Sequence, residues 1–429
     1  MRTTRILALT ISLVVLAACT HGTSPASIPS AATGGASETP VPGDVVVLGI
    51  GGGIGAVDAS TGRVVSLVPG AIPEPDWSHV YATTSVAGST RVDRIATATG
   101  EIVSSVSVAG DLQIRAVAPL GQAIALMPPR TGSANAWVPE PRAHTQIVVA
   151  DPSGSADAKR FSLKGNFEPE AFSPDASTLF MLQYRPALAP TSYRVVGLYL
   201  ETGRHWALIG PDKQPVENMT ATRLVQVASP NGSYLYTLYT NQRPAYLHEP
   251  APSAPPHADG EVAFVHTVDL RSGFAVCIAL PAGFGTVPPQ SSAVAISPGG
   301  HLVYAIDAQH GTIASVNVRR YRVAAITHLD LSMFGSGQIH ARVSADGATL
   351  FVAGDTGLLA LDTQNFTPLG TIMSTPGAIT GLALSGDGAR LYLSWGDELQ
   401  RLDAATLQPS NELHLTSVGA VEFVGTTGA

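Results

Sequence analysis

Five short segments share one pattern and decide the fold: SPDASTLF (173–180), SPNGSYLY (229–236), SPGGHLVY (297–304), SADGATLF (344–351) and SGDGARLY (385–392). Each begins with small turn-forming residues and ends in a strand-like run with an aromatic residue at its eighth position. EPDWSHVY (74–81) is a weaker copy, and APLGQAIA (118–125) is a degenerate one that lacks the aromatic residue. A pattern that returns in one register along the chain indicates repeats of a single structural unit.

Each copy is followed by two more strand-like runs joined by a polar turn, as in VVGLYLETGRHWALI (195–209) and GLLALDTQNFTPLGTI (357–372). A Gly-containing or polar turn between alternating apolar runs is typical of a β-hairpin. An apolar run also precedes the turn of several copies, for example at 224–228 and 293–296. Every unit is therefore predicted to contain four strands, which we call A to D in chain order.

Four-stranded units of roughly 40–50 residues are typical of β-propeller blades. The SPDG-like turn, the following strand and the later hairpin resemble the YVTN-type (WD-repeat-like) propeller repeat family over about residues 44–424. We expect an all-β propeller of eight blades, or seven if the degenerate copy is merged with a neighbour. The first unit lacks a strand A, and the C-terminal run at 418–424 lacks a partner, so this run is predicted to close the ring and remove two sheet edges.

Composition agrees with an all-β fold. Charged residues are 13% of the 429, apolar residues are 45%, and Gly (43) and Pro (32) are abundant. Few charges with many turn residues favour short strands over helices, and the apolar content is sufficient for a large core. The net charge of −8 argues against a nucleic-acid partner.

The N-terminus resembles an export signal sequence. Arg2 and Arg5 precede an apolar run, which ends in Leu-Ala-Ala before Cys19. The run is too short to span a bilayer and resembles a secretory signal peptide with a bacterial lipobox. We expect residues 1–18 to be the signal peptide, residues 19–43 to be a lipidated Cys19 with a flexible Ser/Pro/Thr/Gly-rich tether, and residues 44–429 to form one propeller domain. An ordinary signal peptide with a chance Cys is the alternative.

This signal sequence predicts a protein held on the membrane by lipid and facing outside the cytoplasm, at the cell surface or in the periplasm. The expected partners are therefore the membrane, through the lipid anchor, and an envelope protein, a cell-wall polymer or a small anionic ligand. We expect a monomer.

The sequence contains no recognised catalytic, metal-binding or phosphate-binding motif, and we expect no cofactor. Quinoprotein dehydrogenases are eight-bladed, and residues 201–206 (ETGRHW) resemble part of their blade motif, but the other units lack its Trp. Lactonase-like propellers use single acids at the central tunnel, and Glu170 is one candidate for such a role. The sequence favours a binding or scaffolding module, with an envelope hydrolase of the lactonase-like type as the alternative.

The long insertions indicate where a ligand would bind. Blades three, four and five each extend the loop between strands B and C, at 128–144, 183–192 and 240–261, and long loops on one face of a scaffold commonly carry binding sites. All three insertions begin with an Arg beside a Pro and have an aromatic residue nearby. The predicted ligand-binding residues are Arg130, Trp137, Tyr184, Arg185, Arg243 and Tyr246. The alternative is that these arginines pair with loop carbonyls or acids and only hold the loops in place.

Overall fold

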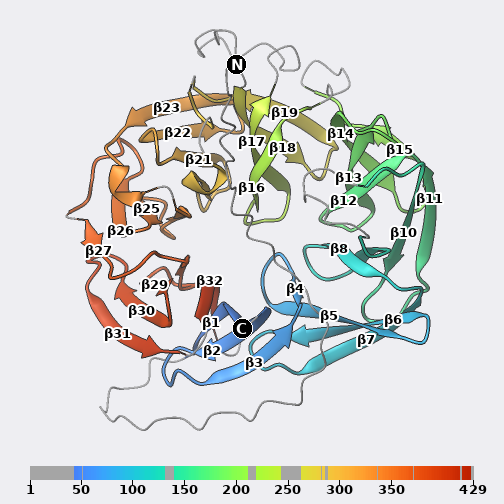
Figure 1. Cartoon of the computed structure of the whole chain (residues 1–429), viewed down its shortest axis with the longest axis horizontal. Coiled ribbons are helices and arrows are strands. Elements are labelled where there is room, and N and C mark those ends of the chain that lie inside the picture. The colour runs from blue at the N-terminus through green and yellow to red at the C-terminus, as the bar shows by residue number, and fades with distance from the viewer. Residues whose placement is uncertain are drawn as a thin grey trace, which may run out of the picture. The chain divides into compact units, whose positions relative to one another are not determined.

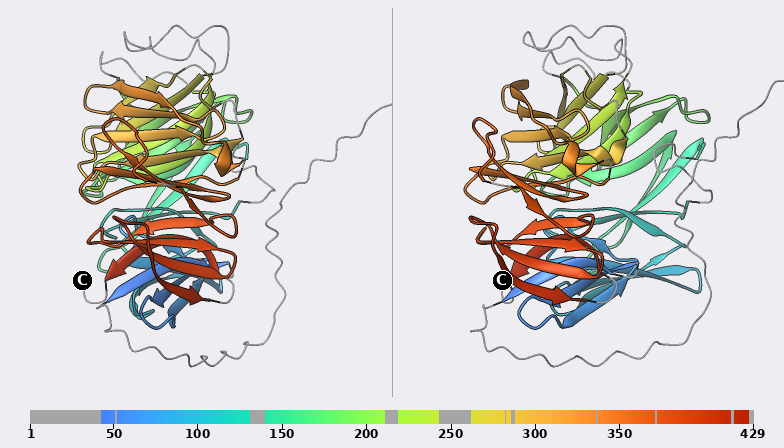
Figure 2. Two further views of the ribbon diagram at one scale, coloured as in Figure 1. Left: turned by 90° about the vertical axis from the view of Figure 1, so that its left-hand side faces the viewer. Right: turned by 60° about the vertical axis from the view of Figure 1, so that its left-hand side comes forward.

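The computed structural model describes residues 43–429 except 51, 131–139, 211–218, 243–261, 282, 286–287, 336, 371, 416–417 and 427–429. Eight four-stranded antiparallel sheets are arranged in a ring, so the described chain is an eight-bladed β-propeller (Figure 1). The strands run between the two end faces of the ring, as the side views show (Figure 2). The described residues contain no helix with the length and apolar character of a membrane span.

The first four blades follow the chain from residue 44, except that the first strand of blade 1 comes from the C-terminus. Blade 1 contains β32 (Val418–Thr426), β1 (Asp44–Ile50), β2 (Gly53–Asp58) and β3 (Val64–Pro69); blade 2 contains β4 (Ile72–Pro73), β5 (His79–Val86), β6 (Ser89–Ala96) and β7 (Ile102–Ala109); blade 3 contains β8 (Gln113–Val117), β9 (Ile124–Met127), β10 (His144–Ala150) and β11 (Lys159–Lys164); blade 4 contains β12 (Asn166–Phe172), β13 (Thr178–Arg185), β14 (Ser192–Tyr199) and β15 (His205–Ala207).

The other four blades are each continuous in sequence, and two short 3-10 helices, η2 (Pro289–Ser291) and η3 (Ser332–Phe334), lie in the connections that the structure describes. Blade 5 contains β16 (Thr222–Ala228), β17 (Tyr234–Gln242), β18 (Val262–Asp269) and β19 (Phe274–Ala279); blade 6 contains β20 (Ser292–Ile296), β21 (Leu302–Asp307), β22 (Thr312–Asn317) and β23 (Arg322–His328); blade 7 contains β24 (His340–Val343), β25 (Thr349–Gly354), β26 (Gly357–Asp362) and β27 (Met373–Ser374); blade 8 contains β28 (Gly381–Leu384), β29 (Arg390–Trp395), β30 (Glu398–Asp403) and β31 (Pro409–His414).

The repeated segment forms the turn from strand A to strand B. In blade 4 the Asp175 carboxylate accepts hydrogen bonds from the Ser173 hydroxyl (2.6 Å) and from the Ser177 amide (3.1 Å). The next residue, Ala176, has φ 54°, and Gly occupies this position in several other copies because that conformation favours it. The aromatic residue at the eighth position, such as Phe180, is buried between blades. The repeat thus supplies both the turn and an aromatic core residue in the six blades that carry a full copy.

The predicted closure of the ring is confirmed. β32 pairs antiparallel with β1, with Val424 opposite Val46. Blade 8 is also fastened to blade 1, because the Asp44 carboxylate accepts hydrogen bonds from Arg390 Nε (2.6 Å) and from the Tyr392 hydroxyl (2.6 Å). The degenerate copy at 118–125 is a true turn between β8 and β9, so the count is eight blades and the seven-bladed alternative is excluded.

The first strand of each blade lies toward the centre of the ring, and the fourth lies at its rim (Figure 1). The inner strands therefore surround the axis, and their ends and the adjoining loops form the two faces. The predicted insertions of blades 3 and 4 fall between strands B and C, that is, between β9 and β10 and between β13 and β14; most of the third one, at 240–261, lies outside the described residues.

Candidate functional site

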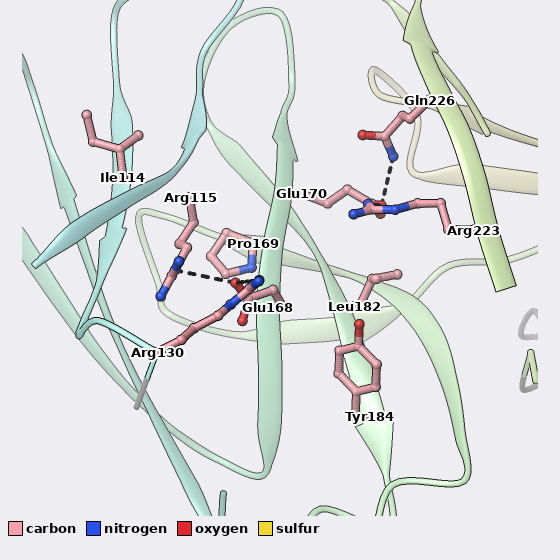
Figure 3. Close-up of a pocket in the computed structure, with 10 residues that line it drawn as sticks. All are labelled: Ile114, Arg115, Arg130, Glu168, Pro169, Glu170, Leu182, Tyr184, Arg223 and Gln226. Atoms are coloured by element: carbon pink, nitrogen blue, oxygen red, sulfur yellow. Dashed lines mark hydrogen bonds and ion pairs between the residues drawn. The ribbon is translucent and has the colours of Figure 1, made fainter. Parts of the chain in front are cut away.

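A cavity of about 260 Å³ lies where the inner strands of blades 3, 4 and 5 meet the face with the long B–C loops. Its wall is predominantly polar and contains three arginines and two glutamates, drawn in Figure 3. The charged residues come from β8, β12 and β16 and from the loop after β9. Three neighbouring blades thus contribute charged side chains to one small space.

Glu168 is shared by three arginines, and we call Arg115, Arg130, Arg142 and Glu168 the arginine cluster. Arg130 donates to Glu168 Oε1 at 2.9 Å, and Arg142 donates to Glu168 Oε2 at 3.1 Å. Arg115 Nε lies 3.4 Å from Oε1, within ion-pair distance, but this buried nitrogen makes no hydrogen bond in the part of the chain that the structure describes. The carboxylate therefore offers one negative charge to three guanidinium groups.

The electrostatics of the cluster follow from this imbalance. Burial lowers the pKa of the Arg115 guanidinium; Glu168 opposes this effect, while Arg130 and Arg142 add to it by repulsion. A smaller contribution from Glu140 favours the charged form. A guanidinium remains charged even with such a shift, because its ordinary pKa is above 12. The cluster is thus a positively charged recess with incomplete neutralisation.

A second ion pair forms the other wall of the cavity. Glu170 accepts hydrogen bonds from Arg223 Nη1 and from Gln226 Nε2, both at 2.8 Å. Burial alone would lower the pKa of Arg223, but Glu170 raises it above its ordinary value. This pair is balanced in charge, in contrast to the arginine cluster.

Backbone irregularities place two of these side chains. The pairing register of β8 with β9 shifts between Ile114 and Ala116, and that of β12 with β13 shifts between Pro169 and Ala171. Arg115 and Glu170 are the extra residues in these two bulges. A β-bulge turns a side chain away from the regular alternation of the strand, and Pro169 cannot donate a ladder hydrogen bond. The bulges therefore direct Arg115 and Glu170 into the cavity.

The B–C loops are tied to the same inner strand. Asn166, fully buried at the start of β12, donates from Nδ2 to the carbonyls of Glu140 (2.8 Å) and Ala187 (3.2 Å). These carbonyls belong to the loops of blades 3 and 4. One buried amide thus holds both loops beside the arginine cluster.

Buried tyrosines pack behind the cavity. Tyr184 lines it, and its ring lies 5.6 Å from that of Tyr193, which in turn lies 6.1 Å from Tyr239. Burial, with a smaller contribution from Glu170, raises the pKa of Tyr184 to about 12. The tyrosine hydroxyls are uncharged near neutral pH. The ring of Tyr184 gives the cavity an apolar floor, and its hydroxyl is a polar tip.

The structure brings together two of the six predicted ligand-binding residues, Arg130 and Tyr184. Arg185 is exposed and does not line the cavity, because neighbouring residues of a strand point to opposite faces. It lies near Arg194. The pKa of Arg194 is lowered mainly by burial and further by repulsion from Arg185. Trp137, Arg243 and Tyr246 lie outside the described residues.

The expected pairing of the arginines also differs in detail. Arg130 and Arg142 do form ion pairs, but with Glu168 of β12 rather than with an acid of their own loop. Sequence reasoning missed Arg115, Arg223 and Glu168 altogether. The one local signal was Pro169 inside a strand, because a Pro there marks a bulge.

The arrangement suits binding of an anion rather than metal chemistry. Within the described ranges, no group of three or more His, Cys, Asp or Glu side chains is placed to hold a metal ion. Glu168 and Glu170 each face arginines, and these positive charges repel a cation. Planar guanidinium groups, in contrast, match the geometry of carboxylate, phosphate and sulfate groups.

No family model matches the sequence, and no curated protein matches it. Solved structures with similar folds include the dihydro-heme d1 dehydrogenase NirN in complex with DHE, with a TM-score of 0.54 and 15% identity over 90% of this chain and 75% of that chain. AztD from Citrobacter koseri has a TM-score of 0.51 and 10% identity, with 90% and 97% covered. The class of protein defined here is the eight-bladed β-propeller, and at these identities the likenesses support the fold alone.

Proposed function

We propose that this protein is a lipid-anchored, extracytoplasmic β-propeller of the YVTN type that binds a small anionic ligand. The anionic group of the ligand binds at the arginine cluster, on the face with the long B–C loops. Arg115 and Arg130, which line the cavity, are the binding residues; Arg142 adds positive charge through its contact with Glu168, and Tyr184 contacts the adjoining part of the ligand. The resemblance of residues 1–19 to an export signal sequence supports the location, because Cys19 follows an apolar segment with small residues before it.

One observation carries the proposal: three arginines share a single carboxylate in a recess. The side chains of Arg115 and Glu168 are about nine-tenths buried, at 11% and 10% exposure, while Arg130 is 34% exposed. A ligand carboxylate or phosphate would supply the missing negative charge and accept a hydrogen bond from Arg115 Nε. Hydrogen bonds to charged groups are stronger than neutral ones, by about twofold. The excess of positive charge therefore favours a small anion over the other expected partners, a protein or a cell-wall polymer.

The hydrolase alternative depends on tunnel acids that are available to a metal or substrate. Glu170, the acid considered for this role, accepts hydrogen bonds from Arg223 and Gln226 and is 4% exposed. A carboxylate committed to a guanidinium is a poor metal ligand and a poor general base. The geometry thus supports binding better than hydrolysis.

The test is a titration of the mature protein with sulfate, in which the melting temperature is measured at each concentration. A ligand that binds only the folded state stabilises it by about 2.7 kcal/mol at one hundred times its Kd. We expect sulfate to raise the melting temperature of the wild type more than chloride at matched ionic strength, and to lose this effect in Arg115→Gln.

The control variant is Arg91→Gln, because Arg91 is an exposed arginine of blade 2 that forms a surface ion pair with Asp93. It should respond to sulfate like the wild type. An equal sulfate response in Arg115→Gln and in the wild type would refute binding at the arginine cluster.

A further inference from the structure

A larger cavity, of about 1070 Å³, lies at the other end of the axis, on the face with the A–B turns. Its wall consists mainly of inner-strand residues of blades 2 to 7, the A–B turns of blades 2 to 5 and the C–D turn of blade 5. It shares Arg115, Glu170 and Gln226 with the 260 Å³ cavity. The two cavities are therefore neighbours with a common wall, and Arg115 borders both.

Two further arginines line this larger cavity, Arg271 on an exposed turn of blade 5 and Arg342 on an inner strand. Arg342 of β24 is half-buried, and its Nη1 donates to the carbonyl of Ala341 at 2.9 Å. Among the described residues, no carboxylate lies within ion-pair distance of Arg342. Burial lowers the pKa of its guanidinium, and the charge of Glu422 opposes this effect without a direct ion pair. Arg342 is thus a largely desolvated charged group that no carboxylate contacts directly.

Arg115 and Arg342 lie on opposite walls. Arg115 belongs to the inner strand of blade 3, and Arg342 belongs to that of blade 7. Blades 3 and 7 are four positions apart in a ring of eight, so they face each other across the axis (Figure 1). Two opposite walls of the cavity therefore each carry an arginine.

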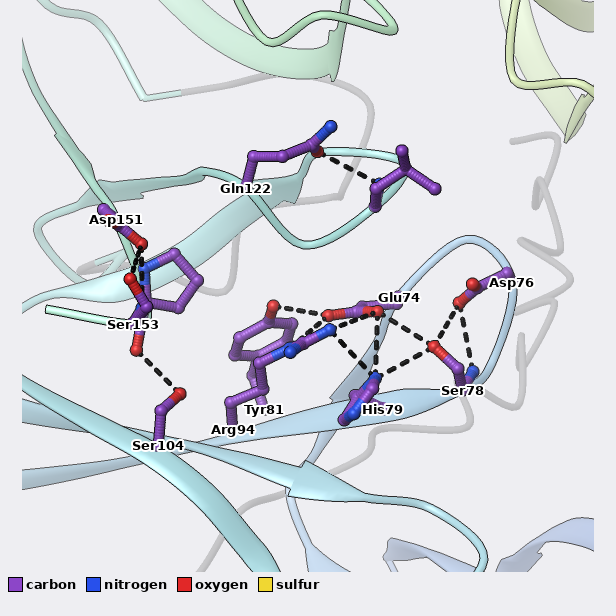
Figure 4. A network of polar contacts seen from close by, with 12 residues as sticks. Glu74, Asp76, Ser78, His79, Tyr81, Arg94, Ser104, Gln122, Asp151 and Ser153 are labelled. Atoms are coloured by element: carbon purple, nitrogen blue, oxygen red, sulfur yellow. Dashed lines mark hydrogen bonds and ion pairs between the residues drawn. The ribbon is translucent and has the colours of Figure 1, made fainter. Parts of the chain in front are cut away.

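Two of the acids around the cavity already face positive partners, while Asp76 and Arg271 lie on its exposed turns. Glu74 is buried and accepts hydrogen bonds from Arg94 (2.7 Å) and the Tyr81 hydroxyl (2.6 Å), as Figure 4 shows. Glu170 is paired with Arg223. Burial lowers the pKa of His340, beside Arg342, to about 4, so it is uncharged near neutral pH.

Part of the wall near Arg115 is apolar. The prolines of the A–B turns reach it, together with Trp77 and Leu120. Leu120 is 68% exposed, an unusual exposure for a leucine, and Trp77 stacks on Phe423 of β32 with ring centroids 6.4 Å apart. Exposed apolar surface rimming a concave space is typical of ligand sites.

We propose that the central cavity binds one bulky apolar or aromatic molecule with two acidic groups, one held by Arg115 and the other by Arg342. The apolar body of the molecule packs against Trp77 and Leu120. This inference rests on the proposed function for the first acidic group and adds the second one, so it defines the class of ligand.

The test uses two fluorescent probes that differ in the number of acidic groups. Anilinonaphthalene sulfonate (ANS) is aromatic with one sulfonate, and its dimer bis-ANS has two. We expect the wild type to bind one bis-ANS with at least tenfold higher affinity than ANS. Arg342→Gln should lower bis-ANS affinity about tenfold and change ANS affinity less than twofold, because a single sulfonate binds at the arginine cluster. Arg115→Gln should lower the affinity of both probes.

The pattern of losses separates the two proposals. If Arg115→Gln weakens both probes and Arg342→Gln weakens neither, the second anchor is wrong and the proposed function stands. If Arg342→Gln weakens both probes equally, the bridging role is also wrong. Unchanged binding of both probes in Arg115→Gln overturns the proposed function itself. Arg342→Lys keeps the charge and should retain most of the bis-ANS affinity, so it separates the effect of lost charge from that of a packing defect. Arg91→Gln is the surface control and should bind both probes like the wild type.

Discussion

Removal of the Glu168 carboxylate should increase the excess positive charge of the arginine cluster. In the described structure Glu168 is the ion-pair partner of Arg115, Arg130 and Arg142, so Glu168→Gln removes the partner of all three. Breaking a buried ion pair by removing one partner costs about 3–5 kcal/mol. Arg130 is one-third exposed and Arg142 is 19% exposed, so solvent screens part of this repulsion. We therefore expect a loss near the lower limit, about 3 kcal/mol, from a total stability of about 5–15 kcal/mol.

The assay is unfolding in urea at low ionic strength, because urea is uncharged and does not screen the cluster. Sulfate should restore a large part of the lost stability in Glu168→Gln, and it should bind this variant more tightly than the wild type, since the competing carboxylate is gone. The control is Asp93→Asn, which removes the partner of exposed Arg91 and should cost under about 1 kcal/mol. A Glu168→Gln midpoint that equals the wild type and ignores sulfate would show that the cluster carries no excess charge.

Three further predictions concern the rest of the chain. Cys19→Ala should abolish incorporation of a lipid analogue in metabolic labelling, and full labelling of the variant would contradict the lipobox interpretation. Deletion of 418–429 removes the buried side chains of Val421 and Val424, each contributing about 1.5–3 kcal/mol, and exposes two sheet edges. The protein should then melt at a far lower temperature or aggregate, and an unchanged melting temperature would disprove closure by β32. Burial lowers the pKa of His266 from 6.5 to about 4, so between these pH values the unfolded state binds a proton that the folded state does not. The free energy of unfolding should therefore rise by about 3 kcal/mol from this residue as the pH increases from 4 to 6.5. In a pH series of urea titrations His266→Leu should flatten this rise, and a slope equal to that of the wild type would contradict the prediction.

The blades could be predicted from sequence because their signals are local. The Asp175 turn and the aromatic Phe180 lie within eight residues of each other, and the same spacing returns in every clear copy. Turn chemistry and burial act over this short range, so a repeat is visible without knowledge of the fold. Closure by β32 could also be inferred, because one unit lacked a strand and the C-terminal run lacked a partner.

The arginine cluster could not be predicted in the same way. Arg115, Glu168 and Arg223 lie on inner strands of three blades, more than 50 residues apart at each step in the sequence, and only the ring brings them together. The bulges that direct Arg115 and Glu170 into the cavity depend on pairing with the next strand. The insertions pointed to the face on which Arg130 and Tyr184 line the cavity, and Arg185 does not line it because the strand alternation turns this side chain away.

The most direct measurement for the central claim is an anomalous difference map from crystals of the mature protein soaked in selenate, an analogue of sulfate. We expect a selenium peak within hydrogen-bond distance of Arg115 and Arg130, and no such peak in crystals of Arg115→Gln. A wild-type map with an empty arginine cluster and selenate bound only elsewhere on the surface would contradict it.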